Sequence, residues 1–440
     1  VCWVVRSAEY CGGMKYIAYI VNEINERGGD ARVALIQRKA DASVNVLGEL
    51  RSGITVFGDE SEFLSSFKNK VFSNGYVVAA TVELARVVKS LCDSNRKLHP
   101  VLHAQSYEPL MIDDEAMKEE IKKMFHLIPD VISNSNWVTE KLEEDGVKPF
   151  ATINPGVDTK LFYPRGRETG DDRPTVLMPL ISSYPFKGFN RGVSLVKSLW
   201  KCAADKGMEI RILLYGVDNI PELKGIAVCL GTLSPPRLAK VLGTEVDVFI
   251  DPAHIHSYGM PAIEAMASGV SVVSWNNLGI REYAKHGKTA IMFNKNENDA
   301  KIAEAAIELL TDASKRLSLA QNAYTNTIEN HDRNLLVPKF IETFENKFIP
   351  PIIPKKVTFI TPHMRKHGGP TTIIDMANKL SEVGHDVSIL TIYDDINPDI
   401  SNRTDLPIFV GAERLMPCDV LITNSDNPYN DQFSKYAGAK

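Results

Sequence analysis

The sequence lacks several features that would place it in well-known classes. Its six cysteines are scattered without a Cys-x-x-Cys pair, so neither a disulfide framework nor a zinc site is indicated. No apolar run is long enough to span a bilayer. The net charge of −5 gives no reason to expect nucleic acid as a partner. With 44% hydrophobic and 24% charged residues, the composition is typical of a globular protein, and a reducing, cytoplasmic compartment is expected.

Strand-like and helix-like segments alternate along the first third of the chain. At 440 residues, two or three domains are expected at about 150 residues each. The alternation predicts a doubly wound parallel sheet over residues 1–152. The predicted strands are Val1–Val5, Ala31–Ile36, Ile54–Phe57, Tyr76–Ala80, Val101–His103 and Val131–Ser133, and the predicted helices are Met14–Arg27, Glu83–Leu91, Ala116–Phe125 and Trp137–Glu144.

A polar turn at Asn154–Asp158 marks a boundary, after which the alternation resumes. A second α/β domain is predicted at 153–332, then a returning helix within 333–350 and a proline-rich linker at 351–355. The predicted strands are Thr175–Leu180, Ile210–Tyr215, Ile226–Leu230, Val248–Ile250 and Val270–Trp275, and the helices are Val193–Cys202, Pro236–Leu242, Ile263–Ala267, Ala300–Thr311 and Leu335–Phe348.

The stretch Asp247–Tyr283 carries the strongest functional signal. It predicts a buried strand, a helix opening at Gly259 and Pro261, a second strand, and a second helix opening near Ile280. Two helix N-termini at one edge of a parallel sheet would suit a phosphate-bearing ligand. Glu264 is expected in the first turn of the first helix.

An internal repeat follows the linker. Gly368-Gly369 lies 356 residues after Gly12-Gly13, and at the same spacing Val357 falls on Val1 and Gly384 on Gly28. Residues 356–440 are therefore expected to begin a second copy of the first domain, as a partial Rossmann-like segment. One interpretation is that the natural polypeptide continues into a second catalytic unit; the other is a small accessory lobe.

Several motifs together resemble a known family. GMPAIEAMASGVSVV with GIREYAKHGKTAIMF is similar to the signature region of retaining glycosyltransferases of family 4. INPGVDTKLFYP, VISNSNWVTEKL and CGGMK resemble further segments of that family, so the likeness covers residues 1 to about 350. The resemblance implies the α/β GT-B fold, with two Rossmann-like domains facing a cleft. It also implies transfer of a sugar from a nucleotide diphosphate sugar, with retention and without metal or cofactor.

The resemblance assigns roles on the donor side. Lys187 aligns with a lysine that contacts the diphosphate, although a surface lysine in a turn is the alternative. Ser182 stands where the family often has arginine, and Arg191 would compensate or simply be solvated. Leu278, Gly279 and Ile280 form the turn whose N–H groups would meet the diphosphate.

Glu264 aligns with the family glutamate that binds the ribose hydroxyls, whereas a plain helix-dipole role is the alternative. The family usually has another glutamate eight positions earlier, where this sequence has His256. His256 could bind sugar hydroxyls, approach phosphate as a cation, reflect a motif shifted toward His254, or be a loop histidine without a ligand. Gly259 and Met260 would face the sugar in any case.

The first domain supplies the expected acceptor side. Gly12 and Gly13 would allow close approach to phosphate or acceptor, or form an ordinary strand-to-helix turn. His103 follows a strand end and is predicted either as a catalytic residue facing the acceptor or as a core histidine. Acceptor contacts are expected from three residues nearby: Gln105, Tyr107 and Glu108.

The expected reaction is front-side attack by an acceptor hydroxyl, with closure over a hinge at Pro155–Gly156. The acceptor would be a glycan or a lipid-linked saccharide of a polysaccharide pathway, which would bring the enzyme to the inner membrane face. A second glycosyltransferase unit in the same natural chain is the expected partner. A sugar-nucleotide epimerase and a degenerate, non-catalytic nucleotide-sugar-binding module remain as alternatives.

Overall fold

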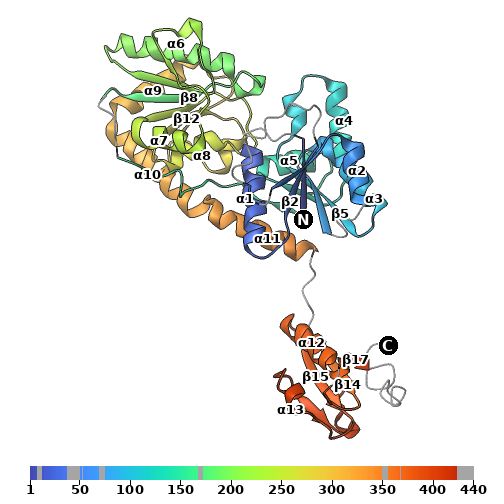
Figure 1. Ribbon diagram of the computed structural model, residues 1–440. Coiled ribbons are helices and arrows are strands. Elements are labelled where there is room, and N and C mark those ends of the chain that lie inside the picture. The colour runs from blue at the N-terminus through green and yellow to red at the C-terminus, as the bar shows by residue number, and fades with distance from the viewer. Residues whose placement is uncertain are drawn as a thin grey trace. The chain divides into compact units, whose positions relative to one another are not determined.

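The computed structural model describes residues 1–6, 12–36, 50–51, 53–68, 75–166, 172–348, 355–366 and 368–423. The chain forms two compact units: unit 1, Val1–Thr343, and unit 2, Phe344–Lys440. Unit 1 contains two parallel sheets and unit 2 contains a third (Figure 1). Residues 351–354 of the expected linker lie outside the described residues.

The first sheet has seven parallel strands in the order β3-β2-β1-β4-β5-β6-β7. The direction of winding reverses between β1 and β4, and the carboxyl ends of strands at such a point are where these sheets bind ligands. All six predicted strands are present, and the two-residue β7 was too short to predict. The strands are β1 Cys2–Val5, β2 Arg32–Ile36, β3 Ile54–Phe57, β4 Gly75–Ala79, β5 Leu98–Ala104, β6 Val131–Ser133 and β7 Ala151–Thr152.

The helices around this sheet bury the apolar faces that their periodicity indicates. In α1, Ile17, Ile20 and Val21 are fully buried, and the helix begins at Gly12, so that the glycine pair forms its first turn. Helix α2 was not predicted, because its segment is largely polar; among residues 60–65, whose burial is described, only Phe63 is fully buried. The elements are α1 Gly12–Glu26, α2 Glu60–Lys68, η2 Val82–Leu84, α3 Ala85–Ser94, η3 Glu108–Met111, α4 Glu115–Phe125 and α5 Asn136–Glu144.

The second sheet has six parallel strands in the order β10-β9-β8-β11-β12-β13. Its winding reverses between β8 and β11, so the carboxyl ends of these two strands are where a ligand is expected to bind. The fully buried run Val248–Ile250 in β11 is typical of a parallel strand covered on both faces. The strands are β8 Thr175–Pro179, β9 Arg211–Tyr215, β10 Val228–Cys229, β11 Val248–Asp251, β12 Ser271–Trp275 and β13 Ile291–Phe293.

Helices cover both faces of the second sheet. Helices α6 and α9 pack together on one face, and α8 packs with α10 on the other (Figure 1). Helix α10 was not predicted, because its buried stripe of Leu319, Ala320, Ala323 and Thr327 is only weakly apolar. The elements are η4 Pro185–Lys187, α6 Phe189–Asp205, η5 Pro221–Leu223, α7 Pro235–Glu245, α8 Met260–Ala267, η6 Gly279–Glu282, α9 Asp299–Thr311 and α10 Ala313–Asn330.

The chain crosses twice between the two sheets of unit 1, and the two crossings lie side by side. The Val157 N–H donates to the His331 carbonyl at 2.8 Å, and the Arg333 N–H donates to the Val157 carbonyl at 3.0 Å. Gly156 has a φ of +65°, and a Cβ there would lie 2.8 Å from Arg333 Cα. The expected hinge position therefore requires glycine for its conformation and for its packing.

After the second crossing, helix α11, Arg333–Phe348, returns to the first sheet and closes an aromatic cluster there. The ring of Phe340 lies 6.2 Å from Trp3, 6.3 Å from Tyr16 and 5.8 Å from His103, measured between ring centroids. His103 is completely buried, and neither of its ring nitrogens has a hydrogen-bond partner among the described residues. The cluster therefore packs α11 against α1 and against β1 and β5 of the first sheet.

A second contact between the two halves involves Glu282, at the end of η6. Its carboxylate accepts from the Trp137 N–H at 3.3 Å and from the side-chain amides of Asn136 at 2.9 Å and Asn154 at 3.3 Å. The Trp137 indole N–H in turn donates to the Ser257 carbonyl at 2.7 Å. A carboxylate at the first turn of α5 also interacts favourably with the helix dipole.

Unit 2 repeats the beginning of the first sheet. Its four parallel strands have the order β16-β15-β14-β17, which matches β3-β2-β1-β4. Helix α12 begins at Gly368-Gly369, as α1 begins at Gly12-Gly13. The elements are β14 Lys356–Thr361, α12 Gly368–Glu382, β15 Asp386–Thr391, α13 Pro398–Ser401, β16 Ile408–Val410, η7 Ala412–Arg414 and β17 Val420–Thr423.

Acidification is expected to destabilise unit 1 between pH 6.5 and pH 4. Burial lowers the pKa of both His103 and His331 to about 4, from an ordinary value of 6.5. The unfolded chain therefore binds more protons in this interval, and the stability that depends on the neutral rings is present above pH 6.5 and lost as the pH falls through 4. For His103 the shift corresponds to about 3 kcal/mol. Denaturant unfolding followed by tryptophan fluorescence at a series of pH values measures this loss.

The matched variant is His103→Leu, which keeps the volume of the side chain but removes its protonation. Because the two ring nitrogens have no partner to lose in the described part of the chain, we expect unchanged or higher stability at neutral pH and a smaller loss on acidification. An identical acid dependence in the variant and the wild type would contradict the assignment.

Glu282→Ala is expected to destabilise unit 1 by about 1–2 kcal/mol, because three donors lose a charged acceptor. The control is Arg281→Ala. Arg281 also contacts the other half of unit 1, through Glu140 at 3.5 Å, but both partners are exposed, so a change below about 0.5 kcal/mol is expected. Equal losses in the two variants, measured by thermal unfolding, would remove Glu282 from this role.

Candidate donor site at the second sheet

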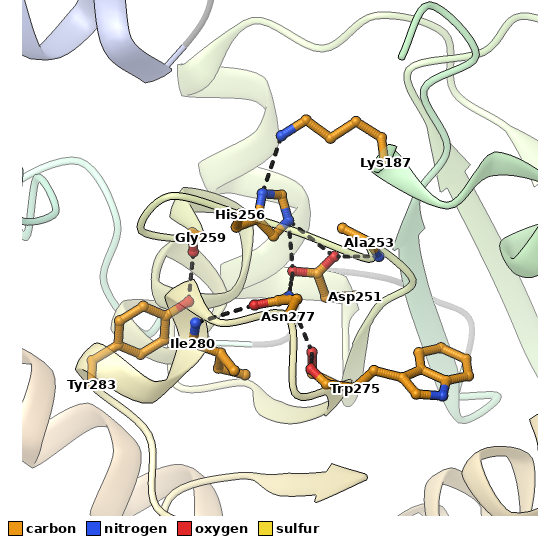
Figure 2. A network of polar contacts seen from close by, with 10 residues as sticks. Lys187, Asp251, Ala253, His256, Gly259, Trp275, Asn277, Ile280 and Tyr283 are labelled. Carbon is orange, nitrogen blue, oxygen red and sulfur yellow. Dashed lines mark hydrogen bonds and ion pairs between the residues drawn. The ribbon is translucent and has the colours of Figure 1, made fainter. Parts of the chain in front are cut away.

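Three connections meet at the carboxyl edge of the second sheet, where its winding reverses. Lys187 ends η4, which follows β8; residues 252–259 follow β11; and η6 follows β12. Figure 2 shows that Lys187 and His256 point toward one another, with Asp251 and Asn277 behind His256. These side chains form one continuous polar network.

The network is built on the carboxylate of Asp251, which ends β11 and is completely buried. Three donors surround it: the Ala253 N–H at 3.1 Å, the Asn277 side-chain amide at 3.1 Å, and Nε2 of His256 at 3.0 Å. Burial acts most strongly and by itself would raise the pKa of Asp251, but His256, the Ala253 N–H and Lys187 together lower it. The carboxylate is therefore ionised at neutral pH.

His256 bridges the carboxylate and the lysine. Its Nε2 faces Asp251, and its Nδ1 lies 3.1 Å from the Lys187 ammonium nitrogen (Figure 2). Burial is the main cause that lowers the pKa of His256; Lys187 acts in the same direction and Asp251 opposes it, so the ring is neutral. Both ring nitrogens are engaged within the protein. His256 is thus a buried residue of the network, and its role toward a sugar or a phosphate stays a prediction.

The turn after β12 differs from the expectation. The predicted second helix is only the four-residue 3₁₀ turn η6, which offers no helix N-terminus for an anion. The Gly279 N–H donates to the Asn277 carbonyl at 2.9 Å, and the Ile280 N–H donates to the Asn277 side-chain oxygen at 3.1 Å. In this conformation the two N–H groups expected to meet the diphosphate are therefore already engaged. Leu278 joins them with φ +69° and ψ −60°, the geometry of a strained γ-turn.

Close backbone contacts explain two glycines of the site. A Cβ on Gly188, where φ is +73°, would lie 2.0 Å from the Pro252 carbonyl oxygen. A Cβ on Gly279 would lie 2.7 Å from the His256 carbonyl oxygen. The three connections pack so tightly that side chains are excluded at these positions.

Helix α8 begins beside this network. Gly259 precedes it with a φ of +91°, and its carbonyl accepts from the Tyr283 hydroxyl at 2.6 Å. Glu264 lies in the second turn of α8, not in the first as expected, and it is 5% exposed. Burial is the main cause that raises the pKa of the Tyr215 and Tyr283 phenols, and the charge of Glu264 adds to this. A plain helix-dipole role is therefore wrong for Glu264, because the first turn holds no acidic residue.

Arg191 contacts Trp275 and Lys295, which lie outside the Asp251–His256–Lys187 network. Its guanidinium carbon lies 4.4 Å from the centroid of the Trp275 ring, and one of its nitrogens donates to the Lys295 carbonyl at 3.4 Å. Burial mainly lowers the pKa of Arg191. The contacts of this guanidinium give no support to the expectation that it replaces the arginine absent at Ser182.

The first half of unit 1 brings its two glycines to the site. A Cβ on Gly12 would lie 3.2 Å from Cγ of Met260, so the start of α1 touches the start of α8. A Cβ on Gly13 would lie 2.3 Å from the side-chain oxygen of Gln105, whose amide donates to the Ala80 carbonyl at 3.3 Å. Gly12, Gly13, Gln105 and Met260 therefore come together as a group.

The expectations for Tyr107 and His103 need correction, whereas the acceptor role of Glu108 stays a prediction. Tyr107 is buried in the core, stacked on Phe125 and hydrogen-bonded to Asp145, so it does not face an acceptor. His103 is the core histidine of the aromatic cluster rather than a catalytic residue. Glu108 is partly buried, and burial raises its pKa to about 7.

Sequence reasoning missed Asp251 and Asn277. Asp251 carried a signal, because a charged residue ends an otherwise apolar buried strand, and such a charge needs partners. Asn277 carried none, since its role depends on the adjacency of β11 and β12. Among the described residues there is no cluster of three or more metal-ligating side chains. Nor does any helix of the described chain combine the length and apolarity needed to cross a bilayer.

Comparison with known proteins gives a partial match. Residues 222–326 match the family described as "Glycosyl transferases group 1". The chain is 22% identical over 296 residues to a GDP-mannose-dependent alpha-(1-6)-phosphatidylinositol monomannoside mannosyltransferase of Mycobacterium tuberculosis, covering 66% of this chain and 63% of that protein. It is 30% identical over 173 residues to a 2-deoxystreptamine N-acetyl-D-glucosaminyltransferase of Niallia circulans, covering 37% and 42%. The chain thus spans less than two thirds of these curated relatives.

Solved structures match over a longer stretch. HepE of Anabaena, in complex with UDP and glucose, has a TM-score of 0.64 at 17% identity and covers 78% of this chain and 98% of its own. A sucrose-phosphate synthase of Thermosynechococcus elongatus has a TM-score of 0.62 at 16% identity and covers 79% and 98%. Over 78% of its length the chain accordingly has the fold of these GT-B glycosyltransferases, and residues 222–326 match the group 1 family model.

Proposed function

We propose that this protein is a retaining, metal-independent glycosyltransferase that moves a sugar from a nucleotide diphosphate sugar to a glycan or lipid-linked acceptor. The observation that carries the proposal is the position of Lys187 beside the loop that leads into α8, at the point where the winding of the second sheet reverses. The glycosyltransferase domain at 222–326 includes α8. The names of the relatives favour a UDP-sugar or a GDP-sugar as donor.

The donor side follows from charge. A diphosphate carries negative charge, and the Lys187 ammonium together with the N–H groups in the first turn of α8 would neutralise it without a metal. Glu264, four residues into the same helix, would accept hydrogen bonds from the ribose hydroxyls, since a carboxylate binds two vicinal donors. Gly259 and Met260 would lie beside the sugar. Gly279 and Ile280 would contact the diphosphate only after exchanging their bonds to Asn277.

The reaction proposed is front-side attack. The acceptor hydroxyl oxygen bonds to the anomeric carbon as the bond from that carbon to the phosphate oxygen breaks, and the hydroxyl proton passes to an oxygen of the departing nucleoside diphosphate. No protein nucleophile is needed. The buried carboxylate nearest to position 256, Asp251, already receives three donors, which argues against acid–base chemistry of the epimerase type. Gly12, Gly13 and Gln105 would form the acceptor side, with closure over Gly156.

For residues 356–440, we propose that they belong to a second glycosyltransferase unit of the natural chain. Their strand order and the glycine pair that opens α12 support this assignment. A lipid-linked acceptor would bring the enzyme to the inner face of the membrane.

The direct test is donor turnover. We expect release of UDP or GDP from one member of a panel of nucleotide sugars, with the rate unchanged by chelator, because Lys187 and α8 take the place of a metal. Coupled assay of the released nucleotide measures this. Loss of turnover with chelator would refute the metal-free mechanism, and tight binding without any turnover would favour a non-catalytic binding module.

Glu264→Gln is expected to weaken binding of the preferred nucleoside diphosphate about tenfold, because a hydrogen bond to a charged acceptor contributes roughly 1.5–3 kcal/mol. The variant keeps the side-chain volume, so thermal stability should change little. Glu304→Gln, an exposed glutamate of α9, is the control and should bind as wild type does. Unchanged affinity of Glu264→Gln in calorimetry would remove Glu264 from the ribose role.

A further inference from the structure

The Asp251–His256–Lys187 network fixes which nitrogen of His256 carries the proton. An ionised carboxylate only accepts hydrogen bonds, so Nε2, which faces Asp251 at 3.0 Å, must carry the hydrogen. A lysine ammonium only donates, so Nδ1, at 3.1 Å from Lys187, must be the unprotonated acceptor. The partners on the two sides thus require the same neutral tautomer.

The rest of the loop holds this arrangement rigidly. The His256 backbone N–H donates to the Asn277 carbonyl at 2.9 Å, and the Asn277 amide also donates to Asp251. His256 is 6% exposed, and the connections pack so closely at Gly188 and Gly279 that a Cβ would clash there. The ring therefore presents a fixed acceptor to the end of a long, flexible side chain.

We propose that Asp251 and His256 are positioning residues that hold the Lys187 ammonium in place for the diphosphate of the donor. The inference rests on the proposed function, in which Lys187 binds that diphosphate. The histidine replaces the glutamate expected at position 256 and acts through the lysine instead of touching the sugar. A carboxylate that orients a histidine, which in turn orients a cation, is the arrangement found around many metal-bound histidines.

The energetic advantage is preorganisation. Ordering a long lysine side chain on binding has an entropic cost, and a lysine that is already held avoids most of this cost. Removing the His256 ring should therefore weaken nucleoside diphosphate binding about tenfold through Lys187 alone. Binding of the matching nucleoside, which lacks phosphates, should not change.

A double-mutant cycle tests the coupling. UDP and GDP are titrated calorimetrically into wild type, His256→Ala, Lys187→Ala and the double variant. We expect His256→Ala to lose about tenfold in the wild-type background and almost nothing in the Lys187→Ala background. His256→Asn, which can place an amide oxygen where Nδ1 lies, should recover part of the loss. His254→Ala is the matched control, and its effect should be the same with and without Lys187.

The proposal would be overturned if His256→Ala weakened nucleoside diphosphate binding by the same factor with and without Lys187. It would also be overturned if the variant weakened binding of the nucleoside as much as binding of the nucleoside diphosphate. Nitrogen NMR of histidine-labelled protein gives a readout that is independent of nucleotide binding. It should show His256 with a proton on Nε2 and none on Nδ1, and Asp251→Asn should disturb this state. The opposite tautomer in the wild type would also overturn the proposal. If neither UDP nor GDP binds the wild type while NMR shows the expected tautomer, the proposed donor-binding function is wrong, whereas the hydrogen-bond network of Asp251, His256 and Lys187 is confirmed.

Discussion

The buried charge of Asp251 is the constraint on which the site depends. A carboxylate removed from water is costly unless donors surround it, and here the donors come from three places in the sequence: Ala253, His256 and Asn277. Satisfying that one group draws the loop after β11 against the turn after β12. It also orients the histidine that meets Lys187. The position of the lysine is thus a consequence of the hydrogen bonds that Asp251 requires, transmitted through His256, and removing a donor would leave the buried carboxylate less well satisfied.

Backbone geometry reinforces this arrangement. Gly188 lies against the Pro252 carbonyl and Gly279 against the His256 carbonyl, so the connections after β8, β11 and β12 are in direct contact. Leu278 accepts a positive φ between them, at a cost of about 1–3 kcal/mol, because the surrounding hydrogen bonds determine its conformation. Strain of this kind is typical of sites whose geometry matters more than their local stability. It also explains why the N–H groups of Gly279 and Ile280 are directed at Asn277.

The same winding pattern occurs three times in the chain. The first and second sheets share the strand order that reverses after the first strand, and the four described strands of unit 2 follow the same order. In unit 1 the two reversal points supply the two sides of the site, where Gly12 meets Met260. The crossings at Gly156 and His331 and the contacts of Glu282 join these halves, so the relation between the glycine pair and α8 depends on residues far from either.

The sequence alone determined most strands and most helices of both sheets, because buried parallel strands are continuous apolar runs and their helices have a clear period, whereas the short strands β7 and β13 were not predicted. The resemblance to a known family singled out Lys187, Glu264 and the glycines, and their roles in binding stay predictions. Tertiary structure decided which groups pair: Asn277 lies 26 residues from Asp251, and only the adjacency of β11 and β12 brings them together. Tertiary structure also placed His103 and Tyr107 in the core. His103 packs against Phe340 of α11 and Tyr107 against Phe125 of α4, and the sequence around either residue does not show which helix will cover it. Helix α10 was not predicted, because its buried face consists mainly of small or polar residues, which give only a weak apolar periodicity.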